Sequence, residues 1–479
     1  MNPGTTLGAR FQVEQTTLVA FLVVACAGLT VAWVTVTDPG AYRLALAALL
    51  TGNLLVISAR WPRAAAIGTL AGLPFLALTR RLLIHDAGWT STDPLLLVAP
   101  LVAIALAYRL FAVEGRPLAP DRLSKLVLAL LALTMLQTLN PLGTGIGVNV
   151  VGLLFAGAPL LWFFVGREIA DERTVLKFGA WIIISGTAIA LYGLRQTDVG
   201  FLPWDQAWMS VAGYKSLVVG DATRAFGTFS SAAEYAQYVG AALMTAIVFA
   251  LYRRRWAALA VPMLAVVLFL ASVRATLILA AVATVVVIIF RSVKRPAWAA
   301  TASISVVLLG VGVMHALAPA LEGQARTSQS DLVQHQLGGV ADPLHSDQST
   351  LSIHAKEVRT GMIQSFHNPL GQGVGITSQA ATTLNSTAFT TEVDISDAFV
   401  SLGIFGGVLY VVVIATAFSS TARVFWRDRA LAPLMVLSVL IVSLGQWRNG
   451  GHYAVSAIIW FLLGWVASQR DRSPTSIPR

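Results

Sequence analysis

The chain has 479 residues, of which 56% are hydrophobic and only 12% are charged, and its mean hydropathy is +0.73. This composition excludes a soluble globular protein, because apolar runs of bilayer length recur along the whole sequence. The net charge of +10 does not indicate a nucleic-acid-binding protein, since the Lys and Arg residues cluster in short loops between the apolar runs.

The apolar runs, taken in chain order, predict an all-α polytopic membrane protein with about 14 transmembrane helices. The predicted helices cover residues 16–37, 41–59, 64–79, 94–110, 123–139, 146–166, 175–195, 231–252, 256–271, 275–290, 298–318, 397–418, 431–447 and 453–468. The chain thereby divides into a helical region at 1–318 with a substantial outer loop at 196–230, a large extracytoplasmic loop domain at 319–396, and a second helical region with a cytoplasmic tail at 397–479.

Basic residues lie in alternate loops and predict the orientation of the chain. Arg60 and Arg63 share one such loop, and Arg253 to Arg255 form another. Lys and Arg are enriched on the cytoplasmic side of membrane proteins. We therefore expect a multi-pass protein of the cell inner membrane with both termini in the cytoplasm and its active site on the extracytoplasmic side.

The outer loop at 196–230 is long enough to fold over the membrane. It contains QTDVGFLPWDQAW, whose Trp204 and Trp208 suit the membrane–water interface, and then DATRAFGTFSS, which carries Arg224. An arginine beside a helix start is an arrangement that a phosphate favours, because the free backbone amides there also attract anions. The plain alternative is a loop arginine that contacts lipid headgroups.

The helix predicted after Arg224 has its own start signals. Ser230 and Ser231 both suit the N-cap position. Glu234 lies three residues after Ser231 and is expected to complete a capping box with it. These features place the amides of the helix start close to Arg224.

Arg274 lies in ASVRAT, the only break in a long apolar stretch that runs from Trp256 to Phe290. Two helices of about 16 residues rise only ~24 Å each, less than the ~30 Å hydrocarbon core. The turn should therefore lie below the outer surface, where a charge is costly and usually has a partner or a function. The alternative is an arginine that reaches up to headgroups or pairs with a loop carboxylate.

The polar segment 319–396 interrupts the apolar pattern and contains His335, His345, His354 and His367. The histidine spacing fits neither a zinc finger nor a paired-ligand helix, so we predict no metal site. Residues 352–366 have a helical pattern. Its His354, Val358, Gly361 and Ser365 form one face, whereas Arg359, Met362, Ile363 and Phe366 form a neighbouring one.

Several residues are candidates for a general base. His354 is the preferred one, because Glu357 lies one helical turn away and can orient the imidazole. Glu392, Asp394 and Asp397 form an acidic alternative at the outer end of the next predicted helix, although Asp397 also suits a simple capping role. A loop histidine without a catalytic role is the plain reading of His354.

Further basic residues on the outer side suit structural or surface contacts. Arg359 and the turn RNGGH, from Arg448 to His452, are also placed to line the same pocket. The sequence contains neither GxxxxGK[ST] nor an Asp-x-Asp pair, so ATP and metal-bound nucleotide sugars are not indicated. A polyprenyl diphosphate is the expected donor for sugar transfer on this side, with two arginines neutralising the leaving group and no metal or other cofactor.

The sequence resembles the O-antigen ligase and O-antigen polymerase superfamily over roughly residues 139–464. The resemblance lies in RAFGTFSSAAEYAQYV, in SVRAT, and in HNPLGQGVG followed after a polar gap by DAFVSLGIFGGVLY. It implies a metal-independent GT-C type glycosyltransferase that moves a glycan from undecaprenyl diphosphate to an acceptor hydroxyl. By motif position, it also implies that Arg224 and Arg274 bind the diphosphate.

One position departs from the ligases of this superfamily. They carry a His-Asn or His-Ser pair eleven residues before the glycine that matches Gly403, and this chain has Glu392 there. The difference favours a polymerase, whose base would be Glu392, Asp394 or Asp397, or a displaced His354 or His367. Because His367 precedes a general NPxxGxG turn of the superfamily, a role in the fold is expected for it.

The leading hypothesis is therefore a polymerase that joins undecaprenyl-diphosphate-linked oligosaccharide repeat units into a surface polysaccharide of the cell envelope. The nearest alternative is a ligase that transfers the finished glycan to a lipid or protein acceptor. A polysaccharide flippase or secondary transporter is the alternative from another class, but the sequence shows no internal repeat and few charges within the predicted spans. The expected partners are the lipid-linked glycan, its acceptor and membrane lipids, without nucleic acid.

Overall fold

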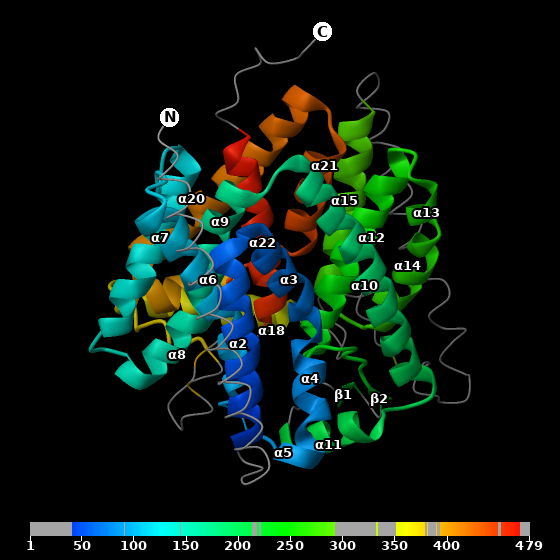
Figure 1. Cartoon of the computed structure of the whole chain (residues 1–479), viewed down its shortest axis with the longest axis horizontal. Helices are drawn as coiled ribbons and strands as arrows, with labels where there is room; N and C mark the ends of the chain where they lie inside the picture. The colour runs from blue at the N-terminus through cyan, green and yellow to red at the C-terminus, as the bar shows by residue number, and fades with distance from the viewer. Residues whose placement is uncertain are drawn as a thin grey trace, which may run out of the picture.

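The structure is a computed structural model that describes residues 41–90, 92–143, 145–212, 218–219, 222–292, 332–333, 351–378, 381, 389, 393–448 and 452–469. These residues form a bundle of helices with one short hairpin (Figure 1). The helices are α2 (Tyr42–Arg60), α3 (Pro62–Gly72), α4 (Leu76–Leu82), α5 (Ile84–Ala87), α6 (Val98–Ala107), α7 (Arg122–Leu136), α8 (Ile146–Ala156), α9 (Ala158–Ile169), α10 (Glu172–Asp198), α11 (Pro203–Ala212), α12 (Ala232–Leu251), α13 (Arg255–Ala258), α14 (Ala260–Leu270), α15 (Arg274–Arg291), α18 (Leu351–His367), α20 (Asp394–Asp428), α21 (Leu431–Val442) and α22 (Tyr453–Ser468). Strands β1 (Val218–Val219) and β2 (Ala222–Thr223) pair antiparallel.

The helices support a multi-pass membrane protein. Within the described residues, nine helical segments are long and apolar enough to cross a membrane, and three shorter apolar ones cover 255–270, 431–442 and 453–468. Together they correspond to twelve of the predicted spans. The predicted spans 16–37 and 298–318 lie outside the described residues.

Contacts between helix ends show which of them lie together at each end of the bundle. At the basic end, Arg63 pairs with Asp171, and Tyr252 donates to the Arg429 carbonyl oxygen at 3.0 Å. The opposite end, which we call the pocket end, holds α5, α11 and the hairpin (Figure 1). It also holds the described parts of the connections between α7 and α8, between α14 and α15, and between α21 and α22. The basic loops predicted from the sequence thus share one end of the bundle.

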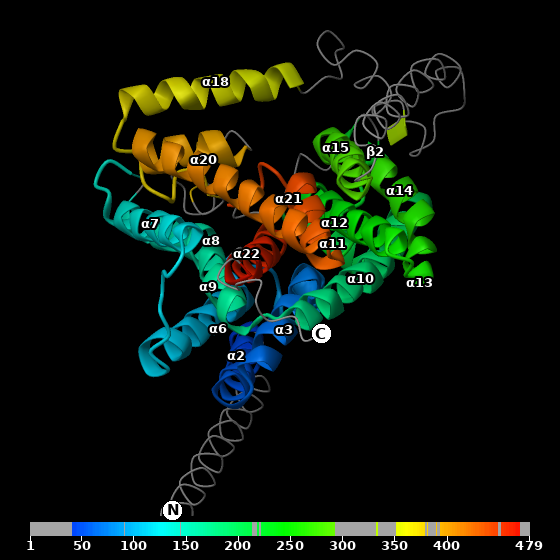
Figure 2. The ribbon, with the colours of Figure 1, turned by 90° about the horizontal axis from the view of Figure 1, so that it is seen from above.

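Helix α22 lies in the middle of the bundle in both views (Figures 1 and 2). It packs on α9 at two glycines, Gly166 and Gly464. A Cβ atom at Gly166 would overlap the carbonyl of Phe461, and one at Gly464 would overlap the carbonyl of Phe163. Small residues at such crossings let two backbones approach closely, which is how helices pack where water provides no driving force.

The predicted break near Arg274 is present. Helix α14 ends at Leu270, Ser272 has a positive φ of 56°, and α15 begins at Arg274. Helix α20 is longer than predicted and runs from Asp394 to Asp428, with a kink at Gly403, where φ is 75° and ψ is −176°. The expected start at residue 397 was wrong because the polar first turn of α20 is buried rather than part of an outer loop.

The loop at 196–230 folds into α11 and the hairpin. Trp208 is only 3% exposed, and its ring lies 4.9 Å from that of Phe226. Trp204 donates its indole N–H to the Tyr192 hydroxyl at 2.9 Å. The prediction that Trp208 lies at a membrane interface is therefore wrong, because the loop buries this side chain in its own small core.

The predicted loop domain at 319–396 is described only in part. Its central helix is present as α18, which packs against α20 (Figure 2). Gly361 and Ser365 are buried, whereas Arg359, Ile363 and Phe366 are exposed. The two faces predicted for this helix are confirmed at these positions.

Candidate functional site

Arg81 fixes the segment that carries Arg224. The Arg81 side chain is 1% exposed and forms an ion pair of 3.3 Å with Asp205. Its Nη1 and Nη2 donate to the carbonyl oxygens of Phe229 at 2.9 Å and Gly227 at 2.6 Å. A buried arginine with carboxylate and carbonyl partners on one segment holds that segment in a single position.

Two uncharged side chains complete the attachment. The amide oxygen of Gln196 accepts from the backbone N–H groups of Phe226 and Gly227 at 3.1 and 2.8 Å. The Thr228 hydroxyl donates to the carbonyl oxygen of Pro74 at 2.6 Å. The sequence analysis did not predict the role of Arg81. Its position in the last turn of an apolar run could have indicated it, because a basic residue that is buried there needs a partner.

The start of α12 confirms one prediction and corrects another. Ser231 is the N-cap, and its hydroxyl accepts from the amides of Ala233 and Glu234. The capping box is wrong: the Glu234 carboxylate, 5% exposed, accepts instead from the Ala454 N–H at 3.0 Å. The reason is that Glu234 faces the start of α22, whose first amides lack partners within their own helix.

Arg224 and Arg274 are both half-buried at the pocket end. The segments that carry them are neighbours, because Ala225 and Ala271 border the same small gap in the packing, together with Tyr235 of α12. Arg274 is the first residue of α15. The structure therefore brings the two predicted phosphate-binding segments together, although they are far apart in the sequence.

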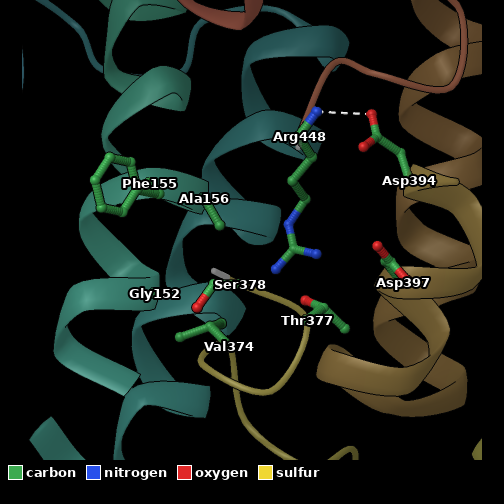
Figure 3. Close-up of a pocket in the computed structure, with 9 residues that line it drawn as sticks. All are labelled: Gly152, Phe155, Ala156, Val374, Thr377, Ser378, Asp394, Asp397 and Arg448. Carbon is green, nitrogen blue, oxygen red and sulfur yellow. Dashed lines mark hydrogen bonds between the residues drawn. The ribbon is translucent and has the colours of Figure 1, made fainter. Parts of the chain in front are cut away.

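A second pocket lies between α8, the turn after α18, the start of α20 and the loop before α22 (Figure 3). It is lined by Gly152, Phe155, Ala156, Val374, Thr377, Ser378, Asp394, Asp397 and Arg448. Figure 3 shows the Arg448 side chain extending from its loop toward the centre of the pocket, with the two aspartates on one side. We call this the Arg448 pocket.

A glycine-rich turn forms one wall of the Arg448 pocket. Gly371 and Gly373 both have positive φ values, and a Cβ atom on Gly371 would overlap the backbone of Gly403. The Asn149 amide oxygen accepts from the Gly375 N–H at 2.9 Å. These contacts give the HNPLGQGVG motif a structural role, since they hold the turn that presents Val374 to the pocket.

Asp394 and Asp397 come from the first turn of α20, where negative charge is stabilised by the helix dipole. Asp394 is 2% exposed and accepts from the backbone N–H of Arg448 at 2.7 Å and from the Tyr410 hydroxyl at 3.0 Å. Asp397 is 8% exposed and lines the pocket. It is not the N-cap predicted as an alternative, since Val393 occupies that position.

Arg448 is buried, with 6% of its surface exposed. Its Nη1 donates to the Ser401 hydroxyl at 3.0 Å, whereas Nε and Nη2 have no hydrogen-bond partner among the described residues. Burial lowers the pKa of Arg448, and the charges of Asp394 and Asp397 oppose this shift. An unsatisfied buried donor typically costs about 1–3 kcal/mol, and more when it is charged. Such a group calls for an acceptor, and one water molecule in the adjacent space would supply it.

The remaining candidates do not join this group. Arg359 and His367 are exposed on α18 and do not line the Arg448 pocket. The Nδ1 of His367 lies 3.0 Å from the Ile363 carbonyl oxygen, within its own helix. The expectation that Arg359 shares a pocket with Arg448 is wrong, because Arg359 is exposed and does not line that pocket.

Two of the proposed bases are not placed by the structure. Glu392 lies outside the described residues, as do His335 and His345. His354 belongs to α18, but its side chain is also outside the described part, so its pairing with Glu357 stays a prediction. His452, at the start of α22, is 5% exposed, and burial lowers its pKa to about 4.

The comparisons with known proteins found no match. No protein-family model matches the sequence, and no curated protein matches it. The resemblance to the O-antigen ligase and polymerase superfamily therefore stays a prediction from the motifs.

Proposed function

We propose that this chain is a glycosyltransferase of the inner membrane that polymerises polyprenyl-diphosphate-linked oligosaccharide units on the extracytoplasmic side. The observation that carries the proposal is the gathering of cations and carboxylates at the pocket end. Arg224 and Arg274 lie on neighbouring segments, and the Arg448 pocket adds Asp394 and Asp397 at the same end. The basic loops at the opposite end support a cytoplasmic location for that end.

In the proposed reaction, Arg224 and Arg274 bind the diphosphate of the donor lipid. The acceptor hydroxyl oxygen attacks the anomeric carbon, and the bond from that carbon to the diphosphate oxygen breaks. The electron pair of this bond remains on the diphosphate, where two guanidinium groups stabilise the developing charge. The proton of the attacking hydroxyl passes to a carboxylate, for which Asp397 is positioned in the pocket wall.

The attachment of the Arg224 segment supports a catalytic role for that segment. Groups that stabilise a leaving group must be held in place before the reaction, because reorganisation would consume their stabilising effect. Arg81 of α4 and Gln196 of α10 bond to this segment, and Thr228 of the segment bonds to the Pro74 carbonyl. A lipid headgroup contact alone does not require a segment held by a fully buried ion pair.

The test is the length of the surface polysaccharide in cells that carry Arg224→Met or Arg274→Met. We expect either variant to abolish long chains at unchanged protein level, because each removes one of the two cations that neutralise the leaving group. Arg255→Met, an exposed change at the basic end, is the matched control and should leave chain length normal. Normal polymer in both single variants would refute the proposal.

Product analysis separates a polymerase from a ligase. Loss of a polymerase leaves single repeat units on the lipid carrier, whereas loss of a ligase leaves finished polymer there. Glu392 at the position of the ligase histidine supports the polymerase. Accumulated polymer on the carrier in the Arg274→Met strain would instead identify a ligase.

A further inference from the structure

Helix α18 leaves one of its sides uncovered. The helix packs against α20, and Gly361 and Ser365 on one side of it are buried. On the opposite side, Ile363 is 45% and Phe366 is 71% exposed, and Leu370 in the turn that follows is 66% exposed. Neighbouring exposed apolar side chains indicate a surface that contacts something other than water.

The direction of α18 is that of a helix lying in a membrane surface. Figure 2, in which α2 is seen nearly end-on, shows α18 lengthwise at the edge of the bundle, with α20 on its inner side. The helix therefore lies across the direction of the span α2. In Figure 1, α5 and α11 extend farther at the pocket end than α18 does. Amphipathic helices at a membrane–water interface lie in this way, with their apolar side chains among the acyl chains.

Hydrogen bonds fix the end of α18 to a membrane span. The Gln137 side chain, which follows directly on α7, donates to the Leu370 carbonyl oxygen at 2.6 Å. The Asn140 side chain donates to the Gly371 carbonyl oxygen at 3.0 Å. The segment 122–139 is long and apolar enough to cross a membrane. The apolar part of the exposed side is thereby held where this span ends.

The exposed apolar surface continues onto the neighbouring spans. The Ile404 backbone N–H of α20 donates to the carbonyl oxygen of Pro369 at 3.0 Å, and the adjacent Phe405 is 77% exposed. Leu136, the last residue of α7, is 66% exposed. Apolar side chains on the outside of a span contact acyl chains. A surface that continues from them faces the same lipid.

The other half of the exposed side is basic. Lys356 and Arg359 are exposed, and their spacing from Ile363 places all three on one side of the helix. Glu357, the only acidic residue in the sequence of α18, is half-buried. Long basic side chains beside an apolar surface extend toward lipid phosphates. Their charge favours anionic headgroups.

We infer that the exposed side of α18 is a membrane-docking surface, in which Ile363, Phe366 and Leu370 contact acyl chains while Lys356 and Arg359 bind the headgroups of anionic lipids. A second copy of the chain fits this surface less well, because the basic half offers it no carboxylate to pair with. The turn after α18 forms one wall of the pocket described above, so docking also holds that wall at the bilayer surface. The inference does not depend on the proposed reaction.

The first experiment measures lipid contact at single cysteines of the full-length protein in nanodiscs. The chain has one cysteine, so Cys26→Ser provides the background. Phe366→Cys and the control Ser210→Cys, both at exposed positions, each carry an NBD fluorophore, and 5-doxyl phosphatidylcholine is the quencher. We expect quenching at residue 366 to be at least about threefold that at residue 210, because α18 lies among the acyl chains and α11 does not.

The second experiment tests the basic half. Thr360→Cys carries the fluorophore in nanodiscs of phosphatidylcholine and phosphatidylglycerol, with the same amount of doxyl group on either lipid. Quenching should be at least about twofold stronger when phosphatidylglycerol carries the doxyl group, and salt should reduce this preference. Lys356→Gln combined with Arg359→Gln should remove the preference. The matched control, two charges removed from the exposed Arg254 and Arg255 at the basic end, should keep it.

Three results would overturn the inference. The first is equal quenching at residues 366 and 210. The second is efficient formation of disulfide-linked dimers by unlabelled Phe366→Cys in membranes, which would show that a second copy covers the surface. The third is a preference for phosphatidylglycerol that persists without Lys356 and Arg359. None of these measurements uses enzymatic activity, so polysaccharide length in the Arg224→Met and Arg274→Met strains decides the proposed function separately.

Discussion

Removing the guanidinium of Arg81 should destabilise the protein strongly. In Arg81→Met, the Asp205 carboxylate would stay buried without its ion-pair partner, and both side chains are at most 1% exposed. The carbonyl oxygens of Gly227 and Phe229 would also lose their donors. Removing one partner of a buried pair costs about 3–5 kcal/mol. We expect a loss in this range, at the upper end because the carbonyls are affected too.

The assay is thermal unfolding of the purified protein in detergent, with limited proteolysis of the loop at 196–230 as a local readout. The control is Arg63→Met, whose ion pair with Asp171 is exposed at 62% and 41%. Exposed pairs contribute about 0–1 kcal/mol, so its midpoint should barely change.

The double variant Arg81→Met, Asp205→Asn tests the physical reason directly. If the loss comes from a stranded charge, neutralising Asp205 should recover part of the stability. A midpoint for Arg81→Met equal to that of Arg63→Met would refute the role of Arg81 in holding the Arg224 segment.

Three further predictions concern other sites. Gly403→Ala should destabilise the protein by at least about 2 kcal/mol, as measured by thermal unfolding, because φ is 75° and ψ is −176° at Gly403, a combination almost restricted to glycine. The control is Gly68→Ala, where no atom lies within 4 Å of the added Cβ. Gly464→Ala should separate α22 from α9 and lower the midpoint similarly, by overlap with a backbone carbonyl. Burial lowers the pKa of His452 from its ordinary 6.5 to about 4, so between these pH values the unfolded state binds more protons than the folded state, and the free energy of unfolding should fall as the pH drops through this window. The measurement is unfolding at a series of pH values. His452→Gln should lose this pH dependence, whereas the control His367→Gln should keep it.

The positions of the spans could be predicted from the sequence, because an apolar run long enough to cross a bilayer has few alternative structures. The break at Arg274 was also predictable, since a charge in the middle of such a run forces a turn. The start of α20 was not. Asp394 looks like a loop residue in the sequence and becomes buried only because the loop before α22 bonds to it.

The grouping of Asp394 with Arg448 could not be predicted for the same reason. The two residues are 54 positions apart, and nothing local to either of them indicates the other. The same holds for Glu234, whose local pattern indicated a capping box although the side chain contacts the start of α22. Local motifs predict helix ends well, whereas contacts between helix ends depend on how the helices are arranged around α22.

The positions of three buried carboxylates narrow the choice of base. Glu234 accepts from the Ala454 amide, and Asp394 accepts from the Arg448 amide and the Tyr410 hydroxyl. Both side chains therefore connect two helix ends. Asp394 and Asp397 both line the pocket into which Arg448 extends. A base must reach the hydroxyl that it deprotonates, so the two aspartates of the pocket wall are better candidates than Glu234, which does not line this pocket.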